Sequence, residues 1–424
     1  MSLAELDRRV MWHPFTQMAE WDPLVIAAGE GNFLVDTEGR RYLDGVSSLW
    51  CNLHGHHHPR LDRAVREQLE RIAHSTFLGL SHAPGIQLGA DLLAVAPSGL
   101  TRVFYSDSGS TAVEIALKQS FQYWQLRGQP AKQRFLRLGD AYHGDTLGAV
   151  GVGGIELFHR VFGPLLVRSI AIPSPAGTDG RAVLAQIDQA LQIRGNEIAA
   201  CILEPLIQGA AGMLVHPDGF LGAVATLCKR HAVHLIVDEV ATGFGRTGTL
   251  FACEQEGVSP DFLCLAKGIS GGYLPLAATL STEEIYAAFL GKREELKQFF
   301  HGHTYTANPL ACAVGIESLA LLRSETLANA AARLCELPTV LARMRGLAGV
   351  REVRHRGLMI GIELESRPSR LLGAEVCQRI RQLGVILRPL GDVLVWMPPL
   401  SLTASELVLL EEATTCAIHD VLAS

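Results

Sequence analysis

Short, mostly apolar runs alternate with longer stretches of helical spacing through the middle of the chain. The runs at 102–105, 200–203, 233–237 and 262–265 have the length and the β-branched, aromatic or leucine content of buried strands. Strands that are apolar along their length are typical of a parallel sheet covered on both faces. The alternation therefore predicts βαβ units and an α/β fold with a largely parallel sheet.

The segments before this region follow a different pattern. Behind Pro59, the apolar residues Leu61, Val65, Leu69 and Ile72 recur at helical spacing, which predicts a helix with one buried face. The first 55 residues are irregular, and we expect them to form a separate N-terminal segment.

The C-terminal part has shorter elements. We predict a helix over 374–383 that Gly384 closes, a strand over 385–387, and a last helix opened by the capping box Thr403-x-x-Glu406. The predicted division is an N-terminal segment at 1–55 that packs with the small domain, a large domain at 56–320, and a small α+β domain at 321–424.

Charge and cysteine content narrow the functional classes. The chain of 424 residues has 37 Lys and Arg against 43 Asp and Glu, a net charge of −6, so no positive field attracts a phosphate backbone or an anionic membrane surface. We therefore expect neither nucleic acid nor membranes as partners. Its nine widely spaced cysteines form no Cys-x-x-Cys pair, which favours reduced core residues. No signal peptide and no apolar run of ~18 residues is present, so we expect a cytoplasmic protein.

Two of the predicted strands lead to a charged residue. The run 235–237 leads to Asp238, and the run 262–265 leads to Lys267. Because ligands bind at the carboxyl ends of parallel strands, the two side chains can face one crevice. A lysine amine can form a Schiff base with pyridoxal phosphate, and a carboxylate can keep the pyridine nitrogen of that cofactor protonated. The alternative is a salt bridge between the strand ends.

A second segment has the composition of a phosphate site. Residues 106–114 follow a predicted strand and open a helix, and the small side chains of Gly109 and Ser110 let backbone N–H groups approach a phosphate. We predict that Thr111-x-x-Glu114 acts as a capping box. The alternative is an ordinary helix cap without a ligand.

Other positions carry weaker signals. Tyr142 can stack on a cofactor ring, or it lies in an ordinary loop. Arg388 can bind a substrate carboxylate through two parallel hydrogen bonds, or it forms a structural ion pair. The histidines at 54 and 56–58 have the chemistry of metal ligands, but no cysteine or carboxylate stands at a matching spacing. We predict that they form a loop before a helix and that the protein has no metal site.

Taken in order, these segments resemble the class III aminotransferases, which have fold type I of the pyridoxal-phosphate-dependent transferases. The resemblance covers nearly the whole chain, and the block from Asp238 to Arg246, Asp-Glu-Val-Ala-Thr-Gly-Phe-Gly-Arg, is specific to the class. Residues 12–18, 47–50 and 142–146 are similar to the branch that transfers an amino group to 8-amino-7-oxononanoate in biotin biosynthesis. The resemblance implies a large domain with helices on a mostly parallel sheet and a smaller α+β domain.

The resemblance also implies roles for individual residues. Lys267 would bind the cofactor and move protons, Asp238 would pair with the pyridine nitrogen, and Tyr142 would lie near the ring. Such enzymes are homodimers with active sites at the interface. The implied phosphate contacts are Gly109 and Ser110, together with His303 and Thr304 from the neighbouring subunit. The implied substrate contacts are Phe15, Trp50, Tyr142, Lys267, Gly302 and Arg388, of which Arg388 would take the carboxylate of the keto acid.

The amino donor stays open at this point. S-adenosylmethionine is the expected donor, but many members that use it have aromatic residues where this chain has Leu49 and Leu400 and a tyrosine in place of Phe15. The segments 271–275 and 299–305 look like those of members that use lysine. A different class III transamination or racemisation of an amine, such as an ω-amino acid, is a further alternative. Ornithine and 4-aminobutyrate are less favoured as substrates, because Ala210 stands where glutamate-using relatives have an acid.

Overall fold

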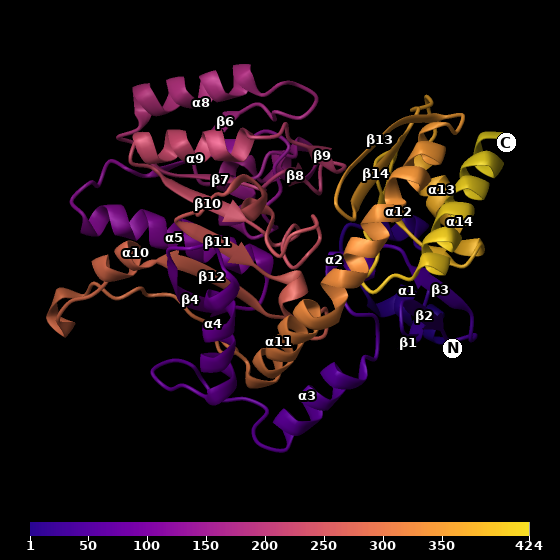
Figure 1. The fold of residues 1–424 in the computed structure, drawn as a ribbon, viewed down its shortest axis with the longest axis horizontal. Helices are drawn as coiled ribbons and strands as arrows, with labels where there is room; N and C mark the ends of the chain where they lie inside the picture. The colour runs from indigo at the N-terminus through magenta and orange to yellow at the C-terminus, as the bar shows by residue number, and fades with distance from the viewer. Residues whose placement is uncertain (424) are drawn as a thin grey trace.

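A seven-stranded sheet forms the centre of the larger part of the molecule in the computed structural model, which describes residues 1–423 (Figure 1). Its strand order is β4 (Leu100–Ser106), β12 (Ala277–Thr282), β11 (Phe262–Leu265), β10 (His234–Asp238), β7 (Ile198–Leu203), β5 (Arg134–Leu138) and β6 (Ser169–Ile172). Only β12 runs antiparallel to its neighbours. The predicted α/β fold with a largely parallel sheet is confirmed, and the four predicted strands are present.

Helices cover both faces of this sheet. Alternate residues of a strand point to opposite faces: Ile202 and Ile236 pack in the cluster that contains α5 (Gly109–Leu126). Their neighbours Leu203 and Val237 belong to the cluster that contains α8 (Arg181–Arg194) and α9 (Phe220–Arg230). Burial on both faces explains why these strands are apolar along their whole length.

Two four-stranded sheets lie beside this unit. One contains β1 (Ile26–Glu30), β2 (Phe33–Asp36), β3 (Arg41–Asp44) and β15 (Val385–Ile386), and the other contains β13 (Val350–Arg356), β14 (Met359–Leu364), β17 (Val393–Trp396) and β16 (Arg388–Leu390). Because β15 pairs with β3, the two ends of the chain share a sheet. The division at residues 55 and 320 stays a prediction.

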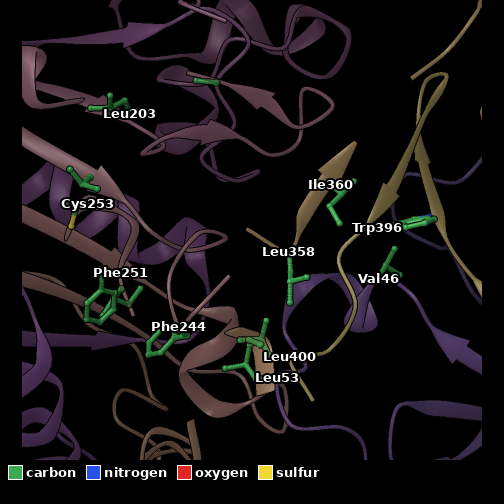
Figure 2. Close-up of a cluster of buried hydrophobic side chains, with 14 of the residues drawn as sticks. Val46, Leu53, Leu203, Phe244, Phe251, Cys253, Leu358, Ile360, Trp396 and Leu400 are labelled. Carbon is green, nitrogen blue, oxygen red and sulfur yellow. The ribbon is translucent and has the colours of Figure 1, made fainter. Parts of the chain in front are cut away.

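One apolar cluster joins these parts. Figure 2 shows Phe244 and Phe251 on the side of the large sheet, and Leu358 and Trp396 on the side of the C-terminal sheet, with Leu53 from the N-terminal segment between them. The N-terminal segment is therefore part of the core (Figure 2).

The remaining elements connect and cover these sheets. They are α1 (Leu3–Val10), η1 (Met18–Glu20), α2 (Ser47–Trp50), α3 (Pro59–Leu69), α4 (Ala83–Val95), α6 (Leu147–Gly151), α7 (Glu156–His159), η2 (Arg160–Leu165), β8 (Ile207–Gln208), β9 (Leu214–Val215), η3 (Ala252–Glu256), η4 (Lys267–Ser270), α10 (Glu283–Ala288), η5 (Arg293–Glu295), α11 (Pro309–Leu321), the π-helical turn η6 (Leu322–Thr326), α12 (Leu327–Arg345), α13 (Leu372–Gln382) and α14 (Ala404–Ala423). No helix within residues 1–423 is long and apolar enough to cross a membrane.

The C-terminal predictions are largely confirmed. The helix over 374–383 is α13, with Gly384 at a φ of 81° behind it, and Thr403 and Glu406 form the predicted capping box of α14. The strand over 385–387 is shorter than predicted, because the chain leaves β15 after Ile386 to enter β16.

The predicted stripe on α3 is wrong in its second half. The helix ends at Leu69, and both Leu69 and Ile72 are exposed in the single chain. Gln68 takes the buried place, and its side-chain amide donates to the carbonyl of Ile72.

The cysteine prediction is wrong for the exposed members. Cys335 and Cys416 are exposed and Cys51 is half-buried, whereas the other six are buried. All nine are free thiols in the structure.

Candidate active site

A cavity of about 650 Å³ opens at the carboxyl ends of the parallel strands. Its wall is formed by residues at or just after the ends of β4, β5, β7, β10 and β11, which the sheet brings to one edge. These are Ser108, Gly109 and Ser110, then Tyr142 to Thr146, and finally Glu204, Asp238 and Lys267. The position agrees with the rule that ligands bind outside the carboxyl ends of such strands.

Lys267 presents an amine without a polar partner within residues 1–423. Among the described residues, its Nζ makes no hydrogen bond or ion pair, and it lies 5.0 Å from the centre of the Trp50 ring. Burial lowers the pKa of Lys267, and the negative charge of Asp238 opposes part of that shift. A lower pKa increases the fraction of neutral amine, which is the nucleophilic form.

Asp238 is fixed by two contacts. Its Oδ2 lies 2.7 Å from Nδ1 of the buried His143, and its Oδ1 accepts a hydrogen bond of 3.0 Å from the backbone N–H of Val240. Because an ionised carboxylate only accepts hydrogen bonds, His143 Nδ1 carries the shared hydrogen. The predicted salt bridge between Asp238 and Lys267 is absent among the described ion pairs.

Glu204 stands beside Asp238 at the same edge. The pairing of Leu203 with Val237 places the two acids next to each other on adjacent strands. The Oε1 of Glu204 accepts a hydrogen bond from the backbone of Tyr142 (3.1 Å), and its Oε2 accepts one from the backbone of Gly209 (2.9 Å). Burial raises the pKa of Glu204 to about 7.

The start of α5, where the sequence predicts an anion cradle, lines the cavity. The first N–H groups of a helix have no acceptor within the helix, and they attract anions. Ser110 Oγ accepts a hydrogen bond from Thr146 N (3.0 Å), which ties the Tyr142 to Thr146 loop to the helix start. Gly144, in the same loop, lies next to the Ser110 side chain and has a φ of 115°. A Cβ at position 144 would lie 2.3 Å from Ser110 Oγ. Only glycine therefore fits at position 144.

The capping box predicted at Thr111 and Glu114 is wrong. Ser108 is the N-cap, and its reciprocal partner is Thr111 at the third helical position. The carboxylate of Glu114 instead accepts hydrogen bonds from the backbone of Gly148 and Ala149. Because the helix begins one turn earlier than the predicted box requires, Glu114 lies too far along it to reach the cap.

Aromatic side chains connect the cavity to Arg388. The Tyr142 hydroxyl donates to Asp145 Oδ2 (2.7 Å), and burial raises the pKa of Tyr142. The Phe158 ring contacts both Phe15 (5.3 Å between centres) and Tyr142 (6.3 Å). The guanidinium of Arg388 lies 5.8 Å from the Phe15 ring centre and has no carboxylate partner among residues 1–423. The predicted structural ion pair of Arg388 is therefore not formed.

Trp50 is held by a left-handed turn. The four residues Ser47 to Trp50 have φ angles of 46°, 49°, 72° and 73°. Such a conformation costs about 1–2 kcal/mol for each non-glycine residue. Asp44 offsets part of this cost, because its buried carboxylate accepts hydrogen bonds from the N–H (2.9 Å) and the hydroxyl (2.7 Å) of Ser48. Sustained backbone strain of this kind is typical of functional sites.

The buried Arg246 anchors the same turn. Its Nη2 donates to Ser47 Oγ and to the carbonyl of Asn52, both at 2.8 Å, and its Nη1 donates to the carbonyl of Pro398. Burial lowers the pKa of Arg246 to about 10. Arg246, the last residue of the block from Asp238, thus supplies a buried cation whose hydrogen bonds hold the Trp50 turn in place.

Gly302, His303 and Thr304 lie outside this cavity. They line a separate groove of about 750 Å³ together with His74, Thr76 and Leu78. The single chain therefore does not bring these three predicted residues to its own Lys267.

The histidine loop has a structural role in its own chain. His58 is the N-cap of α3, and His54 contacts Thr326 (2.8 Å) and Ser318 (3.0 Å) inside the protein. Within residues 1–423, no group of His, Cys, Asp and Glu has the arrangement of a metal site.

The residues of the cavity fit pyridoxal phosphate. Lys267 supplies an amine without a partner, and Asp238 supplies a carboxylate fixed by His143. The Gly109–Ser110 helix start supplies free N–H groups. The side chain of His143 also has a buried Nε2 without a hydrogen-bond partner in the described protein. An amine, an acid and a phosphate cradle in one cavity are the groups that this cofactor needs.

Two residues of the wall, Glu204 and His143, are not among those that the sequence predicts. Glu204 directly follows the buried strand β7, and Asp238 is the last residue of the buried strand β10. An acidic residue at the end of an apolar strand could therefore have identified Glu204 from the sequence. His143 is adjacent to the predicted Tyr142, but no sequence pattern pairs it with Asp238, which is 95 residues away.

Comparisons with known proteins agree with this geometry. The family described as "Aminotransferase class-III" matches residues 16–418. The adenosylmethionine-8-amino-7-oxononanoate aminotransferase of Nitratidesulfovibrio vulgaris is 52% identical over 440 residues, covering 98% of this chain and 81% of that protein. The protein of the same name from Geobacter sulfurreducens is 46% identical, covering 99% of this chain and 98% of its own.

Solved structures give the same result. The adenosylmethionine-8-amino-7-oxononanoate aminotransferase of Methanocaldococcus jannaschii superimposes with a TM-score of 0.95 at 42% identity, covering 99% of this chain and 98% of that one. A PLP-bound amine transaminase from an uncultivated Pseudomonas species reaches 0.90 at 36% identity, covering 97% and 99%. The chain belongs to the class III aminotransferases.

Proposed function

We propose that this chain transfers an amino group from S-adenosylmethionine to 8-amino-7-oxononanoate, giving 7,8-diaminononanoate for biotin biosynthesis. The observation that carries the proposal is the identity of 46–52%, over nearly the whole chain, to relatives that bear the name of this reaction. We propose the cytoplasm as its location, which fractionation of the source cells tests.

Pyridoxal phosphate is the cofactor of this proposal, as in the structural neighbours of the class that hold PLP or PMP. When bound, it supplies a carbon that takes up the amino group and a ring that accepts electrons from the substrate carbon. Lys267 would hold the cofactor aldehyde, and Gly109 and Ser110 would hold the phosphate. Tyr142 would pack against the ring.

The protein's own groups would handle the protons. The carboxylate of Asp238, fixed by His143 and Val240, would keep a proton on the pyridine nitrogen. The Nζ of Lys267 would take a proton from the substrate carbon and deliver it to the cofactor carbon. Because burial lowers its pKa, this amine can act as a base near neutral pH.

The keto acid would extend from Lys267 towards Arg388. Arg388 lacks a carboxylate partner in the described chain, so its guanidinium is available for the carboxylate of 8-amino-7-oxononanoate. Phe15 and Trp50 would enclose the aliphatic part, and Gly302 would contact substrate from a second subunit.

A homodimer would complete the site. Large apolar side chains are exposed at the groove that holds Gly302, His303 and Thr304: Leu78 and Phe300 line it, and Tyr305 packs on its His74. A patch of this kind on a single chain favours a protein interface. We propose that the covering surface is a second copy, whose His303 and Thr304 reach the phosphate.

Mixed dimers test the shared site. Lys267→Ala and Thr304→Asp should each be inactive, because one removes the amine and the other repels the phosphate. Refolding the two variants together should restore about a quarter of wild-type activity, since half of the dimers are mixed and each has one intact site. No restoration would place both residues in the site of one chain.

Lysine remains the alternative donor. The hydroxyl of Tyr273, in the segment 271–275, is bonded to Asp62 and His58, and Leu400 is fully buried in the core rather than lining the cavity. Neither position therefore presents a polar group to a donor. Transamination of another ω-amine is a second candidate, which the likeness to amine transaminases favours. Mass spectrometry of the product formed with each donor separates these possibilities.

A further inference from the structure

Two aromatic residues of the cavity wall are supported by separate backbone segments. Tyr142 lies on the loop after β5, whereas the Trp50 ring lies beside Gly209, which follows β8. A Cβ at Gly209 would lie 3.3 Å from Cζ3 and 3.5 Å from Cη2 of Trp50, and the first of these distances is tighter than an ordinary contact. A side chain at position 209 would therefore require a small shift of either the Trp50 ring or the Gly209 backbone.

One buried carboxyl group joins these two supports. Glu204 is 5% exposed, and its two oxygens accept the N–H groups of Tyr142 and Gly209, at 3.1 Å and 2.9 Å. No Lys, Arg or His forms an ion pair with Glu204 among the described residues. A buried acid without a cation is costly, so its retention in the wall needs a reason beyond general stability.

We propose that Glu204 is a positioning residue that sets the placement of Tyr142 and Trp50 relative to each other around the Lys267 amine. Each oxygen fixes one of the two supports, so the carboxyl group acts as a spacer between the aromatic residues. This placement rests on geometry in the protein alone, although its effect on turnover rests on the proposed function.

The test variant is Glu204→Gln. The amide keeps the shape of the side chain but has one acceptor oxygen, so its NH₂ group faces a backbone N–H whichever way it is turned. One of the two supports is then released. Glu239→Gln is the matched control, because Glu239 is also fully buried and accepts hydrogen bonds from the backbone of Ala252 and Cys253, but it does not line the cavity.

The first readout does not use activity. The five tryptophans of the cofactor-free protein are labelled with 5-fluorotryptophan, and the ¹⁹F resonance of Trp50 is assigned with Trp50→Phe. We expect Glu204→Gln to shift or broaden the Trp50 resonance and Glu239→Gln to leave it in place. Because the amide releases either the Tyr142 or the Gly209 support, a second sample labelled with 3-fluorotyrosine reports on Tyr142, whose resonance is assigned with Tyr142→Phe. Unchanged Trp50 and Tyr142 resonances in Glu204→Gln, or equal changes in both variants, would overturn the proposal.

The second readout is turnover. Because a displacement of about 1 Å can cost up to ~100-fold in rate, Glu204→Gln should lower kcat about 10- to 100-fold while Glu239→Gln keeps kcat. Gly209→Ala provides an independent variant with the carboxyl group intact, and its added Cβ should move the Trp50 resonance and lower kcat. If Gly209→Ala changes neither, the spacer model is wrong. If the protein transfers no amino group to 8-amino-7-oxononanoate, only the proposed function fails, and the ¹⁹F result still decides the role of Glu204.

Discussion

Leu49 allows a sharp test of the left-handed turn that carries Trp50. Its φ and ψ of 72° and 54° lie in the left-handed region, and its side chain is 48% exposed. In a right-handed helix, glycine is about 1 kcal/mol less stable than alanine. At Leu49 the order should reverse, because the left-handed conformation costs alanine about 1–2 kcal/mol, whereas glycine loses only about 0.5–1 kcal/mol of backbone entropy.

We therefore expect Leu49→Gly to be more stable than Leu49→Ala by about 1 kcal/mol. Both substitutions remove the same exposed apolar atoms beyond Cβ, so the comparison isolates the backbone. The assay is urea denaturation of the cofactor-free protein at one fixed protein concentration, with equal m values as the internal check.

The activity of the same pair should follow the same order. Because glycine adopts the left-handed conformation without the Cβ penalty, it keeps the turn and Trp50 in place, so kcat of Leu49→Gly should be at least that of Leu49→Ala. A glycine variant that is about 1 kcal/mol less stable than the alanine variant would refute the left-handed strain.

The other predictions concern the amine, the acid and the phosphate cradle. Asp238→Asn should retain the cofactor but lose about 100-fold or more in kcat, which absorbance and turnover measured together would check. Because burial lowers the pKa of Lys267, the rate at which an amine reagent modifies Lys267 in the cofactor-free protein should rise with pH and level off at a lower pH than the rate for free lysine. A rate curve that matches that of free lysine would contradict the burial argument. Gly144→Ala should raise the Kd for pyridoxal phosphate at least about 10-fold in a fluorescence titration, because its Cβ would displace Ser110; an unchanged Kd would mean that this loop does not shape the cradle.

The sheet and the strand-end residues could be predicted because their signals are local. A fully buried strand is apolar along its length, and the charged residue where it stops marks the edge at which ligands bind. This is how Asp238 and Lys267 are found, and the same logic extends to Glu204 after β7. The antiparallel direction of β12 has no such signal, because Ala277–Thr282 is as buried as the parallel strands of the sheet.

The errors arise where partners are distant in sequence or absent from the chain. Glu114 satisfies the spacing of a capping box, yet its carboxylate binds backbone groups of Gly148 and Ala149. The left-handed turn at Ser47–Trp50 is specified by Asp44 and Arg246, and no local propensity predicts it for these residue types. The apolar positions Leu69 and Ile72 are exposed in the single chain, which is why helical periodicity alone misplaced them in the core.

The central claim is that the cavity around Lys267 exchanges an amino group between a donor and 8-amino-7-oxononanoate. The most direct measurement is the absorbance of the cofactor-loaded protein after mixing with S-adenosylmethionine, or separately with lysine, followed by addition of 8-amino-7-oxononanoate. We predict that S-adenosylmethionine converts the absorbance of the aldehyde form of the cofactor into that of its amine form and that the keto acid reverses the change. Conversion by lysine alone would change the donor, and failure of the keto acid to reverse either conversion would contradict the account.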